Sequence, residues 1–205
     1  GDTLSGALTR DAGENVGTYA INKGSLGNPN YEITFNSANL TISKKALTVT
    51  ADAKSKTYGS NDPTFTYTSV GLINGDVLSG ALTRDTGENV GSFAIKLGSL
   101  GNANYEITFN SANLTISKKA LTVTADAKSK IYGSNDPALT YTTSGLVGTD
   151  SLTGSLSRAT GENVGTYAIS QGTLDHANYV ITFNSSNPTV TAKPVTVTAD
   201  AKAKV

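Results

Sequence analysis

The residues that could do chemistry are few, and the most regular of them are three glutamates. Glu14, Glu88 and Glu162 each stand in the sequence Gly-Glu-Asn-Val-Gly. A carboxylate at the same place in every copy could belong to a ligand site, or it could cap backbone amides in a turn between two glycines. Acid–base catalysis needs a second titratable group, and no carboxylate or histidine accompanies the glutamate in sequence. The turn role is therefore the favoured interpretation.

Two aspartates in the sequence Tyr-Gly-Ser-Asn-Asp-Pro are the next candidates. Asp62 and Asp136, with the asparagines before them, could offer oxygen ligands to Ca²⁺, but this ion takes about six to eight oxygens. Asn-Asp-Pro instead favours an Asx-type turn set by the proline. The one histidine, His176, cannot form a repeated site and is predicted to be a solvated loop residue. We therefore predict no catalytic, metal-binding or cofactor-binding residues, and no enzyme.

Modification sites are also weakly indicated. Asn39, Asn113 and Asn184 match the N-glycosylation pattern, which arises often by chance. A Lys–Asn isopeptide crosslink would need a lysine, an asparagine and a buried acid converging in the core. The lysines cluster at junctions and loops in the sequence, so neither modification is favoured.

Composition excludes several classes of function. Sixteen basic and sixteen acidic residues cancel, without blocks of like charge, whereas nucleic-acid binders usually concentrate lysine and arginine. No apolar run approaches the roughly 20 residues that cross a bilayer, so no membrane insertion is expected in this segment. The chain has no cysteine. It opens without a signal-peptide pattern, which suggests an internal fragment or a processed product.

Several motifs return at a constant step of 74 residues, the difference between Lys44 and Lys118. Such a period is typical of a repeat array. The recurring motifs are Lys-Lys-Ala-Leu-Thr-Val-Thr from Lys44 and Lys118; Tyr-Gly-Ser-Asn-Asp-Pro from Tyr58 and Tyr132; Gly-Glu-Asn-Val-Gly from Gly13, Gly87 and Gly161; and Asn-Tyr at Asn30, Asn104 and Asn178. The step predicts a partial repeat over 1–44, full repeats over 45–118 and 119–192, and the first strand of a further repeat over 193–205.

Apolar and polar residues alternate within each repeat. Leu47, Val49 and Ala51 alternate with threonines, and similar runs are separated by Gly-, Asn- and Asp-rich turns. This pattern predicts about six short strands per repeat and an all-β fold, with at most a single helical turn over Leu72–Leu78. Only Ser-Lys-Lys joins one repeat to the next, too short for a flexible linker. We therefore expect a fairly stiff rod that advances roughly 30–40 Å per repeat.

The Tyr-Gly opening, Gly-Glu-Asn-Val-Gly, Asn-Tyr-X-Ile-Thr-Phe and Leu-Thr-Ile-Ser-Lys-Lys-Ala-Leu-Thr-Val-Thr-Ala together resemble the MBG domain of the YGX type. The resemblance implies tandem small β-sandwiches, immunoglobulin-like or β-grasp-like. It also implies an extracellular place in large bacterial secreted or surface proteins that are adhesin-like or haemagglutinin-like. The family supplies no catalytic residues. Pro188 and Pro194 depart from the pattern and predict irregularity in the last strand and the junction after it.

A structural stalk, spacer or filament is the predicted function, at the bacterial cell surface. The alternative is an adhesin module in which each repeat binds a glycan or host protein weakly and repetition supplies avidity. Neighbouring repeats of the same chain are the expected partners. The incomplete repeats at the two ends reflect either a fragment or strand donation, in which residues 195–203 of one molecule complete residues 1–44 of another.

Overall fold

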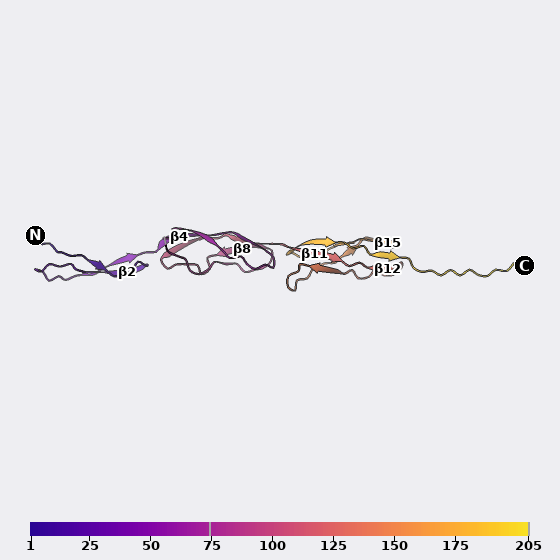
Figure 1. The fold of residues 1–205 in the computed structure, drawn as a ribbon, viewed down its shortest axis with the longest axis horizontal. Helices are drawn as coiled ribbons and strands as arrows, with labels where there is room; N and C mark the ends of the chain where they lie inside the picture. Colours follow the sequence, from indigo (N-terminus) through magenta and orange to yellow (C-terminus); the bar gives the residue numbers. More distant parts are fainter. Residues whose placement is uncertain (74, 205) are drawn as a thin grey trace. The chain divides into compact units, whose positions relative to one another are not determined.

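The computed structural model describes residues 1–73 and 75–204, and its regular secondary structure consists of short strands, drawn as arrows in Figure 1. None of these residues forms a helix. Consequently, the described part of the chain offers no helix with the length and hydropathy that crossing a membrane requires. The structure confirms the predicted all-β class.

The strands follow the repeats. In residues 1–44 they are β1 (Thr9–Arg10), β2 (Gly17–Asn22) and β3 (Ala38–Ile42). In residues 45–118 they are β4 (Lys45–Ala51), β5 (Lys54–Thr57), β6 (Tyr67–Val70), β7 (Thr83–Arg84), β8 (Gly91–Lys96), β9 (Tyr105–Asn110) and β10 (Asn113–Ser117). In residues 119–192 they are β11 (Lys119–Ala125), β12 (Ser129–Ile131), β13 (Tyr141–Ser144), β14 (Ser157–Arg158), β15 (Gly165–Thr166), β16 (Ile169–Ser170), β17 (Tyr179–Asn184) and β18 (Thr189–Thr191).

Two compact units make up the chain. The first unit comprises Gly1–Lys54, Pro63–Gly87 and Ser92–Leu114. The second unit comprises Ser55–Asp62, Glu88–Gly91 and Thr115–Val205. The segments from Ser55 and Glu88 precede the third repeat in sequence, yet they cluster with it. The contacts that join the second repeat to the third therefore lie inside one unit.

The first unit contains two three-stranded sheets. In one, β2 pairs antiparallel with β1 and β3. In the other, β4 is the central strand, antiparallel to β6 and parallel to β9. The parallel register runs from Lys45 opposite Tyr105 to Thr50 opposite Asn110. The second repeat also contains a four-stranded sheet of the order β5-β10-β8-β7.

The second unit repeats this arrangement around β11, which is antiparallel to β13 and parallel to β17. The β12-β18-β15 sheet and the β14-β16 pair correspond to the four-stranded sheet of the preceding repeat. Here β18 has three residues where β10 has five. Pro188, which occupies the place of Leu114, has no N–H to donate to a ladder, so this strand is shorter, in line with the predicted irregularity.

The core of each full repeat confirms the predicted alternation. Leu47, Val49 and Ala51 on β4 are at most 5% exposed, and the threonines between them are less buried. The same core contains Ile95 of β8 and Leu114 of β10. Because strands of two sheets contribute to this core, the second repeat has the two-layer build expected of a small β-sandwich.

Two local expectations need adjustment. About six strands were predicted per repeat, whereas the described residues of 45–118 form seven and those of 119–192 form eight. The difference comes from two-residue strands that periodicity cannot detect. Of the predicted helical turn over Leu72–Leu78, Asn74 lies outside the described residues. The amide of Asp76 donates to the carbonyl of Ile73 at 3.0 Å.

The first glycine of Gly-Glu-Asn-Val-Gly lies against an aromatic ring in every copy. Gly87 has a φ of +139°, and a Cβ atom there would lie 2.3 Å from Cε1 of Phe93. Gly13 and Gly161 meet the rings of Tyr19 and Tyr167 in the same way. Both the backbone conformation and the close approach require glycine.

Replacing Gly87 by alanine should therefore destabilise the chain by roughly 2–4 kcal/mol, from left-handed backbone strain together with the clash against the Phe93 ring. The matched control is Gly101→Ala in the same repeat, where an added Cβ would have no atom within 4 Å. Urea unfolding followed by circular dichroism measures both variants. Equal midpoints for the two would contradict the role given to the ring contact.

Candidate functional site

Two of the three repeated glutamates, Glu88 and Glu162, pair with buried lysines, whereas Glu14 pairs with Arg10. Lys130 of β12 has a side chain only 7% exposed, and its Nζ lies 2.7 Å from a carboxylate oxygen of Asp136 and also pairs with Glu162. One repeat earlier, Lys56 of β5 is 4% exposed and lies 2.7 Å from Asp62 and 2.5 Å from Glu88. Each full repeat thus holds a lysine between an aspartate and a glutamate.

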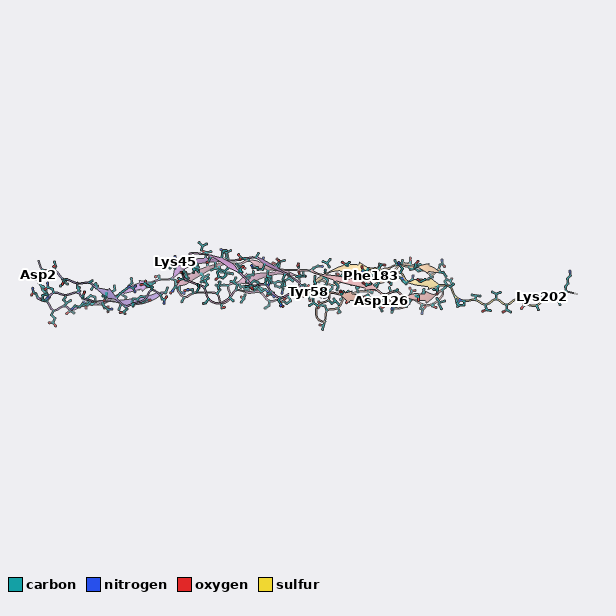
Figure 2. The ribbon with its side chains drawn as sticks, viewed as in Figure 1. Asp2, Lys45, Tyr58, Asp126, Phe183 and Lys202 are labelled. Atoms are coloured by element: carbon teal, nitrogen blue, oxygen red, sulfur yellow. The ribbon has the colours of Figure 1, made fainter. Side chains whose placement is uncertain are left out.

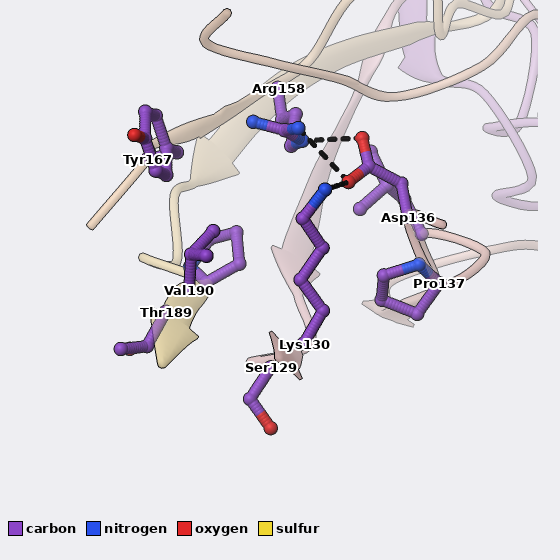
Figure 3. Close-up of a pocket in the computed structure, with 10 residues that line it drawn as sticks. Ser129, Lys130, Asp136, Pro137, Arg158, Tyr167, Thr189 and Val190 are labelled. Atoms are coloured by element: carbon purple, nitrogen blue, oxygen red, sulfur yellow. Dashed lines mark hydrogen bonds and ion pairs between the residues drawn. The ribbon is translucent and has the colours of Figure 1, made fainter. Parts of the chain in front are cut away.

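Arg158 completes this cluster in the third repeat (Figure 3). Its Nε and Nη2 donate to the two oxygens of Asp136 at 2.6 and 2.9 Å, and Nη2 also donates to Glu162 at 2.7 Å. The guanidinium lies 5.2 Å from the centre of the Tyr167 ring. The cavity beside the cluster measures about 10 Å³, room for roughly one water molecule. The charged groups satisfy one another and leave little space for a ligand.

Each charge in the cluster favours the ionised form of its neighbours. The Arg158 fork, followed by Lys130, lowers the pKa of Asp136 to about 2. Hydrogen bonds to Asp136 and Glu162 raise the pKa of Lys130, despite its burial. Burial alone would lower the pKa of Lys56, but its bonds to Asp62 and Glu88 outweigh burial and raise it. General acid–base work and amide formation both need neutral partners, so the electrostatics oppose both.

The structure corrects three expectations about these residues. Glu88 and Glu162 are not simply caps of backbone amides, because each pairs with a lysine. Asp62 and Asp136 likewise bind lysine, a role that adds to any turn role of Asn-Asp-Pro. The lysines lie on strands with buried side chains and not only at junctions and loops. The described residues contain no group of three His, Cys, Asp or Glu side chains that could hold a metal ion.

The cluster predicts acid sensitivity. The pKa of Asp136 is lower in the folded chain, about 2, than its ordinary value of 3.8, so its ion pairs stabilise the fold above that ordinary value and are lost as the pH falls toward 2. Asp136→Asn should lower the melting temperature at pH 7 and flatten its decline across this window. Asp200→Asn, in the exposed coil, should follow the native curve. The measurement is the melting temperature of each chain over a pH series. Parallel curves of melting temperature against pH for Asp136→Asn and the native chain would contradict the role given to Asp136.

A second recurring site lies where the second repeat meets the third. The hydroxyls of Tyr58 and Tyr179 both donate to one carboxylate oxygen of Asp150, at 3.0 and 2.5 Å. The two rings meet edge to face with centres 5.5 Å apart. Burial and the bond to Asp150 raise the pKa of Tyr179 to about 12, and the bond from Tyr179 lowers the pKa of Asp150. A tyrosine from each repeat therefore shares one carboxylate.

The glycine after Tyr58 allows the repeats to approach. Gly59 has a φ of +78°, and a Cβ there would lie 2.5 Å from Cγ2 of Val147 in the following repeat. Any larger residue would push the two repeats apart or distort the loop. Tyr-Gly is thus a junction motif, with the tyrosine as hydrogen-bond donor and the glycine as the point of closest contact.

A buried asparagine closes the same junction. Asn178 is 6% exposed; its Oδ1 accepts the amide of Val90 at 3.0 Å, and its Nδ2 donates to Oδ1 of Asn89 at 2.9 Å. In the first unit, Asn104 makes the same two bonds, to the amide of Val16 at 2.9 Å and to Asn15 at 2.8 Å. Both junctions between repeats are therefore formed by the same kinds of atoms at equivalent positions.

Comparison with protein families agrees with this arrangement. The family described as MBG domain (YGX type) matches residues 1–41, 47–115 and 121–189, which together make up most of the chain. The chain belongs to this family. A search of curated proteins finds no match to the chain. The sequence motifs of these MBG repeats now have physical roles, because Tyr58-Gly59-Ser60 and Gly87-Glu88-Asn89-Val90-Gly91 supply the junction, the ring contact and the lysine partner.

Sequence reasoning missed several residues of the MBG junction and cluster. Asp150 and its counterpart Asp76 accept tyrosine hydroxyls, at 2.5 Å in the bond from Tyr105 to Asp76. Both aspartates recur at the 74-residue step, as do Lys56 and Lys130, so a position-by-position comparison of the copies could have found them. Only the identity of the group across the junction requires the structure.

His176 also differs from expectation. Its Nδ1 accepts the amide of Asn178 at 3.2 Å, and its ring lies 5.0 Å from that of Tyr179. It is a loop residue, as predicted, but it is partly buried beside the junction and not fully solvated. It also lines an open groove of about 490 Å³, together with Tyr58, Asp150 and Thr153.

The two Tyr-Gly motifs allow a matched test of the MBG junction. Gly59 and Gly133 have φ values of +78° and +83°, so alanine at either site carries the same backbone strain, about 1–2 kcal/mol. Only Gly59 meets another repeat, and no atom lies within 4 Å of a Cβ at Gly133. Gly59→Ala should cost about 1–3 kcal/mol more than Gly133→Ala.

Amide hydrogen exchange measures the effect of Gly59→Ala and Gly133→Ala at the junction itself. The amide of Val90, which binds Asn178, should exchange faster in Gly59→Ala and at the native rate in Gly133→Ala. Equal protection of Val90 in both variants would show that Gly59 does not hold the junction together.

Proposed function

We propose that this MBG array is a structural stalk, spacer or filament-forming region of a bacterial extracellular adhesin-like protein, and that it performs no catalysis. Tandem MBG repeats are consistent with a repeat region of a surface protein. The cell surface is the proposed location. The proposal draws its main support from one observation: successive junctions use the same asparagine bonds, Asn104 to Val16 and Asn178 to Val90.

Identical junctions suit a spacer because every added repeat then contributes the same step. A flexible tether would need no buried hydrogen bonds between neighbours, and a buried polar group without its partner costs about 1–3 kcal/mol. The short Ser117–Lys119 connection supports the same reading, since its ends belong to β10 and β11. The titratable clusters support the absence of catalysis, because Lys130 and Asp136 neutralise each other next to a cavity of about 10 Å³.

Weak multivalent binding is the second candidate, favoured by the groove beside the junction. This groove of about 490 Å³ combines the aromatic edge of Tyr58 with Asp150, Thr153 and His176, groups that can contact sugar hydroxyls. The first unit has a smaller counterpart of about 260 Å³ beside Asp76 and Asn104. Glycan-array binding that is lost in both His176→Ala and Thr153→Ala would replace the spacer function with this one.

The spacer function predicts how length depends on repeat number. One, two or three extra copies of residues 45–118 are inserted in phase between Lys118 and Lys119, and the maximum dimension is measured by small-angle X-ray scattering. It should rise by a constant increment of roughly 30–40 Å per copy. A flexible chain would instead grow with about the square root of length, and that result would contradict a stalk.

A junction variant serves as the control for this experiment. Asn178→Ala removes the acceptor of the Val90 amide and the donor to Asn89 without touching the core of either repeat. The distance distribution should broaden in this variant while the strand content stays the same. An unchanged distribution would mean that the asparagine bonds do not hold neighbouring repeats in place.

A further inference from the structure

Two segments of the third repeat, residues 119–131 and residues 179–191, run side by side in the same direction. We call them the first and the last segment of the repeat. β11 pairs in parallel with β17, and β12 pairs in parallel with β18. The register places Lys119 opposite Tyr179 in one pairing and Ser129 opposite Thr189 in the other. The offset is 60 residues in both pairings, since 179 − 119 and 189 − 129 are equal.

The pairing continues where both segments pass from the sheet of β11 to the sheet of β12. Nδ2 of Asn184 donates to Oγ1 of Thr124 at 3.1 Å, and Oγ of Ser186 donates to the carbonyl of Asp126 at 3.0 Å. These partners are again 60 residues apart. Figure 2 shows Asp126 on the first segment and Phe183 on the last. The register is therefore kept throughout, and the two segments form one continuous parallel ribbon.

The second repeat is built in the same way. β4 pairs in parallel with β9, with Lys45 opposite Tyr105, again at an offset of 60 residues. β5 is hydrogen-bonded to β10. Near the end of this pairing, Oγ of Ser117 donates to the carbonyl of Lys56 at 3.2 Å, a bond that recurs at the same distance in the third repeat. Both full repeats therefore join their first and last segments.

Tension along the chain acts on the two ends of this ribbon. The chain enters the third repeat at the start of the first segment and leaves it at the end of the last segment. Because the segments are parallel, these two points lie at opposite ends of the ribbon. A pull on them slides one segment along the other, so the bonds of both ladders are loaded together and not one after another. This mode of loading is shear.

The buried face of the ribbon opposes such sliding. Leu121 and Val123 on the first segment and Tyr179 and Val190 on the last are at most 3% exposed. Side chains alternate between the two faces of a strand, so a slide by one residue turns the core side chains outward. Shear of the ribbon must therefore disrupt the core and both ladders in one step.

We propose that each full repeat is a force-bearing element, which resists tension along the chain because its first and last segments form one parallel ribbon loaded in shear. The antiparallel strands β13 and β15 are attached to this ribbon through β11 and β18, and they lie outside the path of the force until the ribbon breaks. This role goes beyond the proposed spacer function. A spacer needs a constant step per repeat, whereas a force-bearing element must also keep that step when it is pulled.

Optical tweezers with two attachment geometries test the proposal on the 205-residue chain, which has no cysteine of its own. DNA handles on Lys118→Cys and Lys193→Cys pull on opposite ends of the ribbon and load it in shear. Handles on Lys118→Cys and Val180→Cys pull on the same end of the ribbon and peel the two segments apart. All three side chains are exposed, so the fold should survive these changes.

The two geometries break the same bonds in a different order. At equal loading rate, the unfolding force in shear should be at least about twofold higher than the force for peeling, since the barrier to forced unfolding then includes the whole ribbon. Unfolding of one 74-residue repeat in shear should lengthen the tether by roughly 200–240 Å, the extended length of the repeat less its folded length. Equal unfolding forces in the two geometries would overturn the proposal.

A matched pair of variants separates the ribbon from general stability. Asn184→Ala removes the bond to Thr124 in the middle of the ribbon. It should lower the unfolding force in shear and leave the peeling force unchanged, because peeling starts at the Tyr179 end. Thr140→Ala removes a bond to the Asp126 carboxylate from outside the ribbon and should leave the shear force at its native value. A shear force lowered equally by both variants would overturn the role given to the ribbon.

Discussion

The buried carboxamide of Asn178 fixes how the second and third repeats meet, because it binds both Val90 and Asn89 of the preceding repeat. The group is 6% exposed and has one partner for its oxygen and one for its nitrogen, both in the preceding repeat. A buried amide tolerates few alternative orientations, because any slip leaves a donor or acceptor unsatisfied. The same is true of Asp150, which accepts hydroxyls from both repeats. Polar groups, more than apolar area, therefore specify how these neighbours meet.

This constraint explains why the most regular motifs of the chain resemble a catalytic constellation without acting as one. Carboxylates, tyrosines, lysines and asparagines recur at fixed positions, but they are paired with one another. Lys130 is held by Asp136 and Glu162, and the electrostatics keep all three charged. Charged side chains fixed in this way brace the Asn-Asp-Pro loop against the Gly-Glu-Asn-Val-Gly turn, which presents Asn89 and Val90 to the next repeat. The charged cluster thus holds the turn that carries Asn89 and Val90, and these two residues form the junction with Asn178.

The sequence was sufficient to predict the class of fold. Period-2 alternation in Leu47–Ala51 is visible within a few residues, and the constant step of 74 residues is visible when the sequence is compared with itself. It was insufficient for the partners of Glu88 and Asp62. Spacing along the chain does not reveal that β5 places Lys56 between them, with a side chain 4% exposed. The burial of Asn178 was equally hidden, since an asparagine before Tyr179 also suits an exposed turn. The sequence therefore predicts which face of each strand is buried. It does not predict which polar groups meet across strands and repeats.

The third repeat shows how far the unit can drift while keeping this chemistry. Pro188 shortens β18, and the strand that corresponds to β8 is divided into β15 and β16. Yet the register of β11 with β17 and the bonds of Asn178 match those of the preceding copy. Changes are thus tolerated in the sheet that contains β18, whereas the β11–β17 sheet carries the junction at its end and retains its register. The geometry of the junction therefore limits substitution more strictly than the stability of an individual strand does.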